Sequence, residues 1–179
     1  QSLTLMLDTS KNLRMATLHQ WLHGDGAGWG EANLSEVTSL ITDGSHFSPT
    51  TLDAGAPYVT VRDLKDGVID LANAARISEA SFAELEKNGC RPQIGDVLFS
   101  KDGTVGKVAL VDTPERFVVL SSLAILRARP GIAIPAFLAL SMEAPNFQRD
   151  AIGSKTGLAI RRVVLKHLRS LTIPLPPLE

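Results

Sequence analysis

The sequence has too few cysteines for a disulfide scaffold and too few consecutive apolar residues for a membrane span. Its 179 residues include one cysteine, Cys90, so no intramolecular disulfide can form and a reducing, cytoplasmic setting is favoured. No apolar run approaches the roughly 20 residues of a membrane-spanning helix. The first residues show no signal-peptide layout, because Asp8, Lys11 and Arg14 lie among them. With 44% apolar and 21% charged residues, the composition is that of an ordinary globular protein with its own core.

Net charge is also nearly absent, but the charges are unevenly distributed. A net charge of −1 does not by itself suggest a nucleic-acid-binding protein. Between Arg149 and Arg169, however, the chain has six basic side chains and one acidic side chain. The remainder is therefore acidic, and such a chain can present a basic surface while staying close to neutral. The alternative is that these charges cover the solvated face of a helix.

The sequence divides into a short N-terminal part and one larger domain. Residues 1–28 are expected to form a helix, from Ser10 to about His23, followed by a glycine-rich link. Residues 29–179 are expected to form the main domain. Its first part alternates short β-like runs with Gly, Asp and Pro turns, interrupted by one helix with Ser78 as N-cap and Phe82 and Leu85 on its buried side.

After Pro130 the pattern becomes helical. Pro135 and Pro145 each stand at a first-turn position, and a short basic helix is predicted near residues 163–168. The proline-rich end around Pro174 excludes a helix or a central strand there. Strands first and helices later indicate an α+β fold. We expect a twisted, partly barrel-like β core with an N-terminal helix and a helical C-terminal third.

The sequence does not match the catalytic motifs that its glycine-rich and polar stretches superficially resemble. A phosphate-binding loop needs Ser or Thr after Gly-Lys and a helix beyond it, whereas Val108 and a strand-like run follow Gly106-Lys107. The glycine-rich link over 24–30 follows an amphipathic helix rather than a buried strand, so methyl transfer by this chain is rejected. Four histidines and one cysteine, which we expect to be inert, give little support to a zinc site or a hydrolytic triad.

A magnesium-dependent nuclease is the strongest enzymatic alternative. Asp63-Leu64-Lys65 has the Asp-x-Lys pattern, and Asp53 lies upstream, so two carboxylates could hold Mg²⁺ while the lysine steadies an attacking water. The same stretch also reads as a charged turn ending in Asp66-Gly67, which is the favoured interpretation because three-residue matches arise by chance in most chains.

Several polar loops rich in hydrogen-bonding side chains remain, beside the basic segment. Such loops are often plain surface turns, but together they fit a surface that holds phosphates and reads base edges. In the centre of one of them, Asp102-Gly103 between two apolar runs predicts a β-hairpin turn, because glycine accepts a positive φ. The candidate DNA-binding residues in these segments are Ser45, His46, Ser100, Lys101, Asp102, Thr104, Lys107, Ser122, Ser154, Lys155, Thr156, Arg161, Arg162 and Lys166.

The order and spacing of these motifs resemble a target recognition domain from the specificity subunit of type I restriction–modification systems. The resemblance spans roughly residues 29–179 and is carried by six stretches. In order they are Leu34-Ser35-Glu36-Val37, Asp43-Gly44-Ser45-His46-Phe47-Ser48-Pro49, Gly55-Ala56-Pro57-Tyr58-Val59, Leu64-Lys65-Asp66-Gly67-Val68-Ile69-Asp70, Gly95-Asp96-Val97-Leu98-Phe99-Ser100-Lys101-Asp102-Gly103-Thr104-Val105-Gly106-Lys107 and Leu168-Arg169-Ser170-Leu171-Thr172-Ile173-Pro174-Leu175-Pro176-Pro177-Leu178-Glu179.

The resemblance implies a non-catalytic reader of double-stranded DNA. In that family two such domains each read half of a split site, a partner methylation subunit supplies S-adenosylmethionine and adenine-N6 chemistry, and a restriction subunit can join. This chain has one such domain and would carry no cofactor itself. We therefore expect a half-length subunit, which would form a self-dimer, a trimmed chain, or the DNA-recognition region of a larger fused restriction-methylation enzyme.

The predicted loops and their charges also suggest roles for single residues. Ser45, His46, Lys101 and Thr104 are expected at loop tips, where their donors could reach groove edges, although His46 could equally stabilise its own turn. Lys155, Lys166 and one member of the Arg161–Arg162 pair are expected to neutralise phosphates. Gly106 is expected to permit close approach of neighbouring backbone.

Overall fold

The computed structural model describes residues 29–153 and 162–176. The predicted helix over 10–23 and the candidate residues Ser154, Lys155, Thr156 and Arg161 lie outside this part of the chain.

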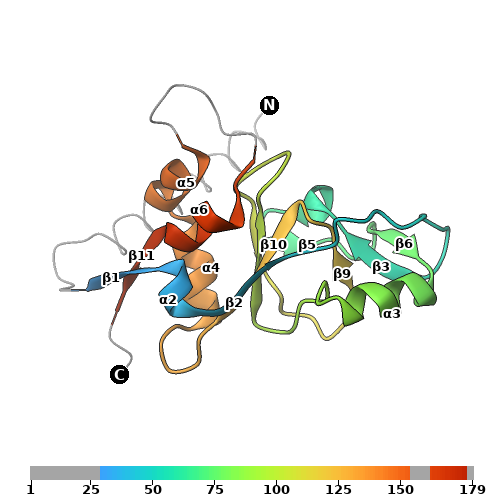
Figure 1. Ribbon diagram of the computed structural model, residues 1–179, viewed down its shortest axis with the longest axis horizontal. Coiled ribbons are helices and arrows are strands. Elements are labelled where there is room, and N and C mark those ends of the chain that lie inside the picture. The colour runs from blue at the N-terminus through green and yellow to red at the C-terminus, as the bar shows by residue number, and fades with distance from the viewer. Residues whose placement is uncertain (1–28, 154–161, 177–179) are drawn as a thin grey trace, which may run out of the picture.

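A four-stranded antiparallel sheet forms the centre of the fold, with helices on one face and a smaller sheet on the other (Figure 1). Its strand order is β2-β10-β7-β8, and the strands are β2 (Thr38–Asp43), β7 (Asp96–Ser100), β8 (Val108–Leu110) and β10 (Leu123–Ala128).

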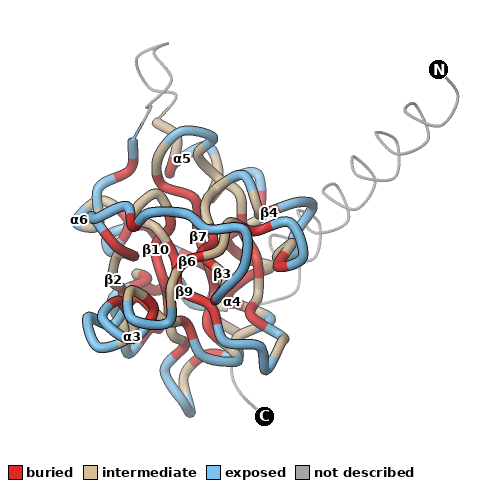
Figure 2. The backbone as a smooth tube through the Cα atoms, turned by 90° about the vertical axis from the view of Figure 1, so that its right-hand side faces the viewer, coloured by how far each residue is buried: buried red, intermediate tan, exposed pale blue. Residues whose placement is uncertain are grey.

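The central strands are apolar on both faces, which explains their uninterrupted apolar runs. Val97 and Phe99 of β7 belong to the cluster that faces the helices. Leu98 of β7 and Ile125 of β10 belong to the cluster that faces the smaller sheet. Successive side chains of a strand point to opposite faces, so alternate residues of one run fill two cores. Figure 2 shows the central strands as buried backbone and the connecting loops as exposed backbone.

The helical layer comes from both ends of the described chain. It consists of α2 (Leu34–Val37), α4 (Pro135–Glu143), α5 (Pro145–Ile152), α6 (Leu165–Ser170) and a ribbon of β1 (Gly30–Asn33) with β11 (Thr172–Leu175). Pro174 pairs with Glu31 in this two-stranded ribbon, where a missing N–H is tolerated. The short α2 was not predicted; there the Glu36 carboxylate accepts the Asn33 N–H at 2.7 Å.

The opposite layer is smaller. It consists of β3 (Ala56–Val59), β6 (Ala75–Ile77) and β9 (Val118–Val119) with α3 (Glu79–Lys87), the 3-10 turn η1 (Val61–Asp63), and a hairpin of β4 (Leu64–Lys65) and β5 (Val68–Ile69). The prediction for α3 is confirmed: Ser78 Oγ accepts the Ser81 N–H at 3.1 Å, and Phe82 and Leu85 are buried.

The α+β prediction and the helical C-terminal third are confirmed. Pro135 and Pro145 begin α4 and α5 as expected, and the basic helix lies two residues later than predicted, at Leu165–Ser170. The sheets of the described residues stay open, so the β core contains no closed barrel. No helix in ranges 29–153 and 162–176 is long and apolar enough to cross a membrane.

Candidate nucleic-acid interface

Four polar segments meet at one end of the central sheet, here called the polar sheet end. β2 and β7 finish at this end and β10 begins there, because both strands pair antiparallel with β10. Lys101 N–H donates to Ser122 O at 2.9 Å, and Ser121 N–H donates to Ser45 O at 2.8 Å. Val163 N–H donates to Lys101 O at 2.7 Å. The polar sheet end comprises residues 43–47, 101–107, 120–122 and 162–163.

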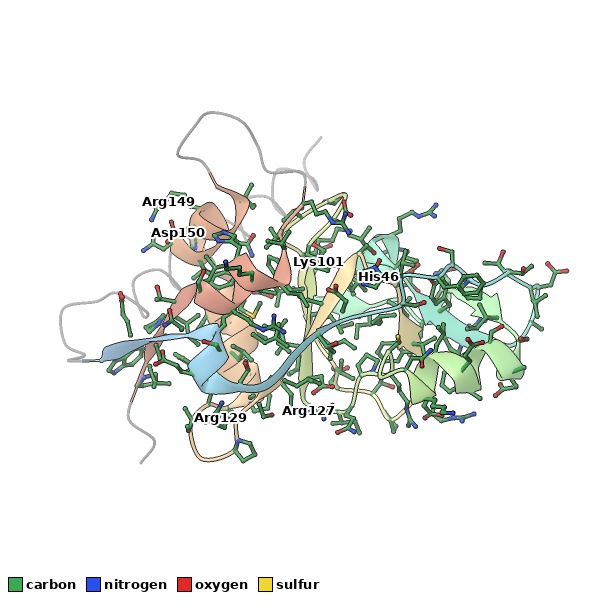
Figure 3. The ribbon with its side chains drawn as sticks, viewed as in Figure 1. His46, Lys101, Arg127, Arg129, Arg149 and Asp150 are labelled. Atoms are coloured by element: carbon green, nitrogen blue, oxygen red, sulfur yellow. The ribbon has the colours of Figure 1, made fainter. Side chains whose placement is uncertain are left out.

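An ion pair with little solvent contact lies inside the polar sheet end. Lys101 Nζ is 3.1 Å from Asp43 Oδ1, and the Lys101 side chain is 3% exposed while that of Asp43 is 20% exposed. His46 Nε2 lies 3.3 Å from the other carboxylate oxygen, Oδ2, with its side chain 69% exposed. Lys101 therefore joins the hairpin to the last residue of β2, and His46 lies on the exposed side of the same carboxylate. Figure 3 shows Lys101 and His46 near the upper end of the central strands and Arg127 toward the lower end.

The hairpin between β7 and β8 is held from within by residues that we expected to touch DNA. Ser100 is fully buried; its hydroxyl donates to Thr104 O and accepts the Lys107 N–H, both at 2.7 Å. Lys107 Nζ donates to Val61 O at 3.0 Å and to Leu64 O at 2.7 Å. Both side chains are thus engaged in shaping the hairpin and in attaching it to η1.

Two glycines shape the hairpin. Gly103 has the predicted positive φ, 72°, and its N–H donates to Asp102 Oδ1 at 2.9 Å. The predicted hairpin is confirmed, because β7 and β8 pair antiparallel on either side of this loop. Gly106 has a φ of 99° and admits a close neighbour, but that neighbour is a side chain rather than the expected backbone. Gln148 Nε2 donates to Gly106 O at 2.9 Å, and a Cβ on Gly106 would stand 2.3 Å from Gln148 Oε1.

The remaining candidates fall into a shielded group and an exposed group. Ser45 is 4% exposed, and its hydroxyl donates to Phe47 O and accepts the Phe47 N–H. The Ser122 hydroxyl is also shielded from solvent. The solvent-accessible candidates are His46, Asp102, Thr104, Arg162 and Lys166.

The basic segment is partly neutralised within the protein. Arg162 Nε lies 3.4 Å from Asp102 Oδ2, and it precedes α6 rather than lying on the helix. Arg149 Nε lies 3.7 Å from Asp150 Oδ1 on α5 (Figure 3), and Arg169 donates to Ile41 O at 2.7 Å. A count of charges from the sequence therefore overstates the positive charge that this segment presents.

The described residues give no support to the nuclease alternative. Asp63 Oδ2 accepts hydrogen bonds from the N–H and hydroxyl of Thr60, at 2.7 and 2.9 Å. Lys65 pairs instead with Asp70, whose pKa its hydrogen bond, with help from Asn73, lowers to about 2. Within ranges 29–153 and 162–176 no group of three or more His, Cys, Asp or Glu side chains is placed to hold a metal ion. The charged-turn interpretation is confirmed, because β4 and β5 pair across a two-residue turn.

Two exposed side chains near the polar sheet end were missed by the sequence argument. Arg62, on η1, is exposed, and Phe47 is 67% exposed although four of the other phenylalanines are buried and Phe137 is half-buried against Trp29. Phe47 lies in the Asp43–Pro49 stretch and Arg62 directly precedes the Asp63–Lys65 turn, but neither pattern shows that the side chain is exposed, which only the tertiary structure reveals. Cys90 is buried, and burial raises the pKa of its thiol, which agrees with the expected inertness.

Comparison with known proteins gives one consistent result. A family model described as "Type I restriction modification DNA specificity domain" matches residues 27–179. The specificity subunit of the type I restriction enzyme EcoBI from Escherichia coli is 25% identical over 125 residues, which are 70% of this chain and 26% of that protein. A protein named as the specificity subunit of type I restriction enzyme MjaX from Methanocaldococcus jannaschii is 26% identical over 159 residues, 84% of this chain and 36% of that protein.

Solved structures agree on the fold. A chain from a study of complex assembly in a type I R-M system superposes with a TM-score of 0.66 at 22% identity, covering 98% of this chain and 43% of that one. The HsdS subunit from Thermoanaerobacter tengcongensis gives a TM-score of 0.58 at 22% identity, covering 98% of this chain and 44% of that one. The chain thus spans less than half the length of these relatives. From the match over residues 27–179, the chain belongs to the family of type I restriction–modification DNA specificity domains.

Proposed function

We propose that this chain reads double-stranded DNA sequence as one target recognition domain of a type I restriction–modification complex. The observation that carries the proposal is the convergence of the polar segments at one end of a rigid sheet, in a chain that belongs to a DNA specificity family. Base-edge recognition needs donors and acceptors in a fixed geometry, and loops braced by three neighbouring strands supply it.

The exposed and shielded groups take different roles in this proposal. Thr104, Asp102 and His46 contact bases, while Arg162, as the one member of the Arg161–Arg162 pair that faces DNA, contacts phosphates together with Lys166 and Lys155. Ser45, Ser100, Lys101, Lys107 and Ser122 hold the loops in place. Direct DNA contact by these five was predicted from sequence and stays untested, and their burial or internal hydrogen bonds favour support over contact.

The chain itself performs no catalysis in this proposal. A partner methylation subunit supplies S-adenosylmethionine and modifies adenine N6, and a restriction subunit cleaves. The half-length, self-dimerising subunit and the recognition region of a fused enzyme are both compatible with this role, since each reads DNA through the same surface. A specific DNA interface usually buries about 1,000 Å² or more, so a single small domain needs a partner to form one.

The first experiment identifies the site that is read. The subunit containing this chain is co-expressed with its methylation partner, and adenine methylation is mapped across the host genome. We expect one methylated motif, half of which changes when the polar sheet end is exchanged. Uniform or absent adenine methylation, with both proteins folded and associated, would contradict the proposal.

The second experiment measures reading directly. Fluorescence anisotropy of the complex is recorded on a duplex with the motif and on a scrambled duplex. Thr104→Ala should narrow the affinity gap between the two by about 1 kcal/mol, the lower end of what one base contact gives. When wild type and the Asp63→Ala variant are each incubated with duplex DNA and Mg²⁺, neither should cleave the DNA. Cleavage lost only in Asp63→Ala would support the nuclease instead.

A further inference from the structure

We propose that Arg62 is a phosphate contact of the DNA-binding surface and that Lys107 positions it without touching DNA. This inference rests on the proposed function and adds to it a residue from outside the predicted loops.

Arg62 differs from the other arginines in how its guanidinium is used. Nine arginines lie in ranges 29–153 and 162–176. Eight of them give their guanidinium to a carbonyl, an amide oxygen or a carboxylate of the described chain: Arg76, Arg91, Arg116, Arg127, Arg129, Arg149, Arg162 and Arg169. Arg62 has neither such a hydrogen bond nor an ion pair with the described residues, and it is exposed. Its five donors are therefore available to an outside acceptor.

The backbone that carries Arg62 is held firmly. Thr60 and Asp63 close a capping box around η1, with the Asp63 carboxylate accepting the Thr60 N–H at 2.7 Å and its hydroxyl at 2.9 Å. The Arg62 N–H donates to Thr60 Oγ1 at 3.4 Å. Because Asp63 is engaged with Thr60, the nearest carboxylate in sequence does not compete for the guanidinium.

The same turn is fastened to the hairpin of the polar sheet end. Lys107 Nζ donates to Val61 O and Leu64 O, on either side of Arg62. A methyl group on Gly103, at the hairpin tip, would lie 3.8 Å from Val61 Cγ1. Arg62 therefore stands beside the tip that carries Thr104. The ammonium of Lys107 beneath the turn also adds positive potential where a phosphate would approach.

Because no described residue holds the Arg62 guanidinium in place, a phosphate is a better partner for it than a base edge. A guanidinium that reads a guanine edge bidentately needs a defined plane, whereas a phosphate offers acceptors over a wide angle. No described residue fixes the plane of Arg62. Phosphate contacts add affinity for every sequence and make binding salt-dependent, with a slope of about 0.9 in the logarithm of affinity per contact.

The test compares salt slopes in the complete complex with the methylation subunit. Arg62→Ala should reduce the slope by about 0.9 on both the motif duplex and the scrambled duplex, leaving their affinity ratio unchanged. Between 50 and 200 mM salt, wild type should then lose about three- to fourfold more affinity than Arg62→Ala. Arg62→Lys, which keeps the charge, should restore most of the slope. Lys87→Ala, an exposed cation in the last turn of α3, is the matched control and should behave as wild type.

The positioning role is tested by combining substitutions. Lys107→Met should reduce the salt slope by as much as Arg62→Ala does. The slope of the double variant should be no lower than that of either single variant. A reduction of the salt slope equivalent to about two phosphate contacts in the double variant would mean that Lys107 binds DNA itself. If Lys107→Met does not fold, Thr60→Val loosens the same turn from its other side and should give the same slope loss.

The possible failures are distinguishable. A salt slope of Arg62→Ala equal to that of wild type would overturn the inference. A smaller affinity difference between the motif duplex and the scrambled duplex in Arg62→Ala would also overturn it, because Arg62 would then contact a base rather than a phosphate. Wild-type complex that shows no preference for any duplex would instead remove the proposed function on which the inference rests.

Discussion

Removing the ammonium of Lys101 should destabilise the domain before it affects any contact with DNA. The side chain is 3% exposed and its ammonium lies 3.1 Å from Asp43 Oδ1. Breaking a buried ion pair by deleting one partner typically costs about 3–5 kcal/mol, because the other charge stays buried without compensation. In Lys101→Met the residual charge is that of Asp43, which is 20% exposed and retains His46 at 3.3 Å. We therefore expect the smaller loss of about 2–3 kcal/mol in free energy of unfolding.

The reverse deletion should cost more. Asp43→Ala leaves the ammonium of Lys101 almost completely buried and without its carboxylate, so we expect about 3–5 kcal/mol. The double variant Asp43→Ala/Lys101→Met leaves neither charge buried alone. Its loss should therefore be smaller than the sum of the two single losses, by at least about 1 kcal/mol.

Urea unfolding followed by circular dichroism measures these values, with Lys166→Met as the control. Lys166 is exposed on α6, so its substitution should change the free energy of unfolding by less than about 0.5 kcal/mol. The reasoning would be refuted by a Lys101→Met variant that is as stable as this control yet has lost discrimination between DNA duplexes. The ammonium would then have to turn outward to the DNA, as the sequence argument first suggested.

Three further predictions concern other parts of the fold. Arg127→Met should lower the free energy of unfolding by about 3 kcal/mol in urea, because it strips the bidentate partner, at 2.8 Å, from Asp96, which is 1% exposed; a loss under about 1 kcal/mol would contradict this. Gly44→Ala should cost about 1–3 kcal/mol in the same assay, since its Cβ would stand 2.3 Å from a backbone carbonyl, and an unchanged midpoint would show that the loop can yield. The side-chain carboxyl carbon of Asp70 should titrate by NMR with a pKa of about 2, so any stabilisation from its pair with Lys65 is present above about pH 4 and fades as the pH falls toward 2; Lys65→Met should return the midpoint toward its usual value, and an unshifted midpoint in wild type would refute the pairing.

Local chemistry explains which elements the sequence could predict. The Ser78 cap, the prolines that begin α4 and α5, and the Asp102-Gly103 turn each depend on residues close together in the chain. Apolar runs likewise identified the central strands. The four-residue α2 was not predicted because it is too short to show a helical repeat of apolar residues.

What the sequence by itself determined is the membership of a DNA specificity family, the α+β class and the set of polar loops, because these follow from composition, motif order and short-range hydrogen bonding. What only the tertiary structure decided is the role of each polar side chain in those loops. Lys101 looked like a loop-tip donor until Asp43, distant in sequence, was found beside its buried ammonium. Arg62 directly precedes the Asp63–Lys65 turn, and only the structure shows that its side chain is exposed on a turn that Lys107 ties to the hairpin. Whether a charge is buried and paired or exposed and free depends on neighbours that the chain brings together only when it folds, and burial changes the energy of a charge more than its residue type does.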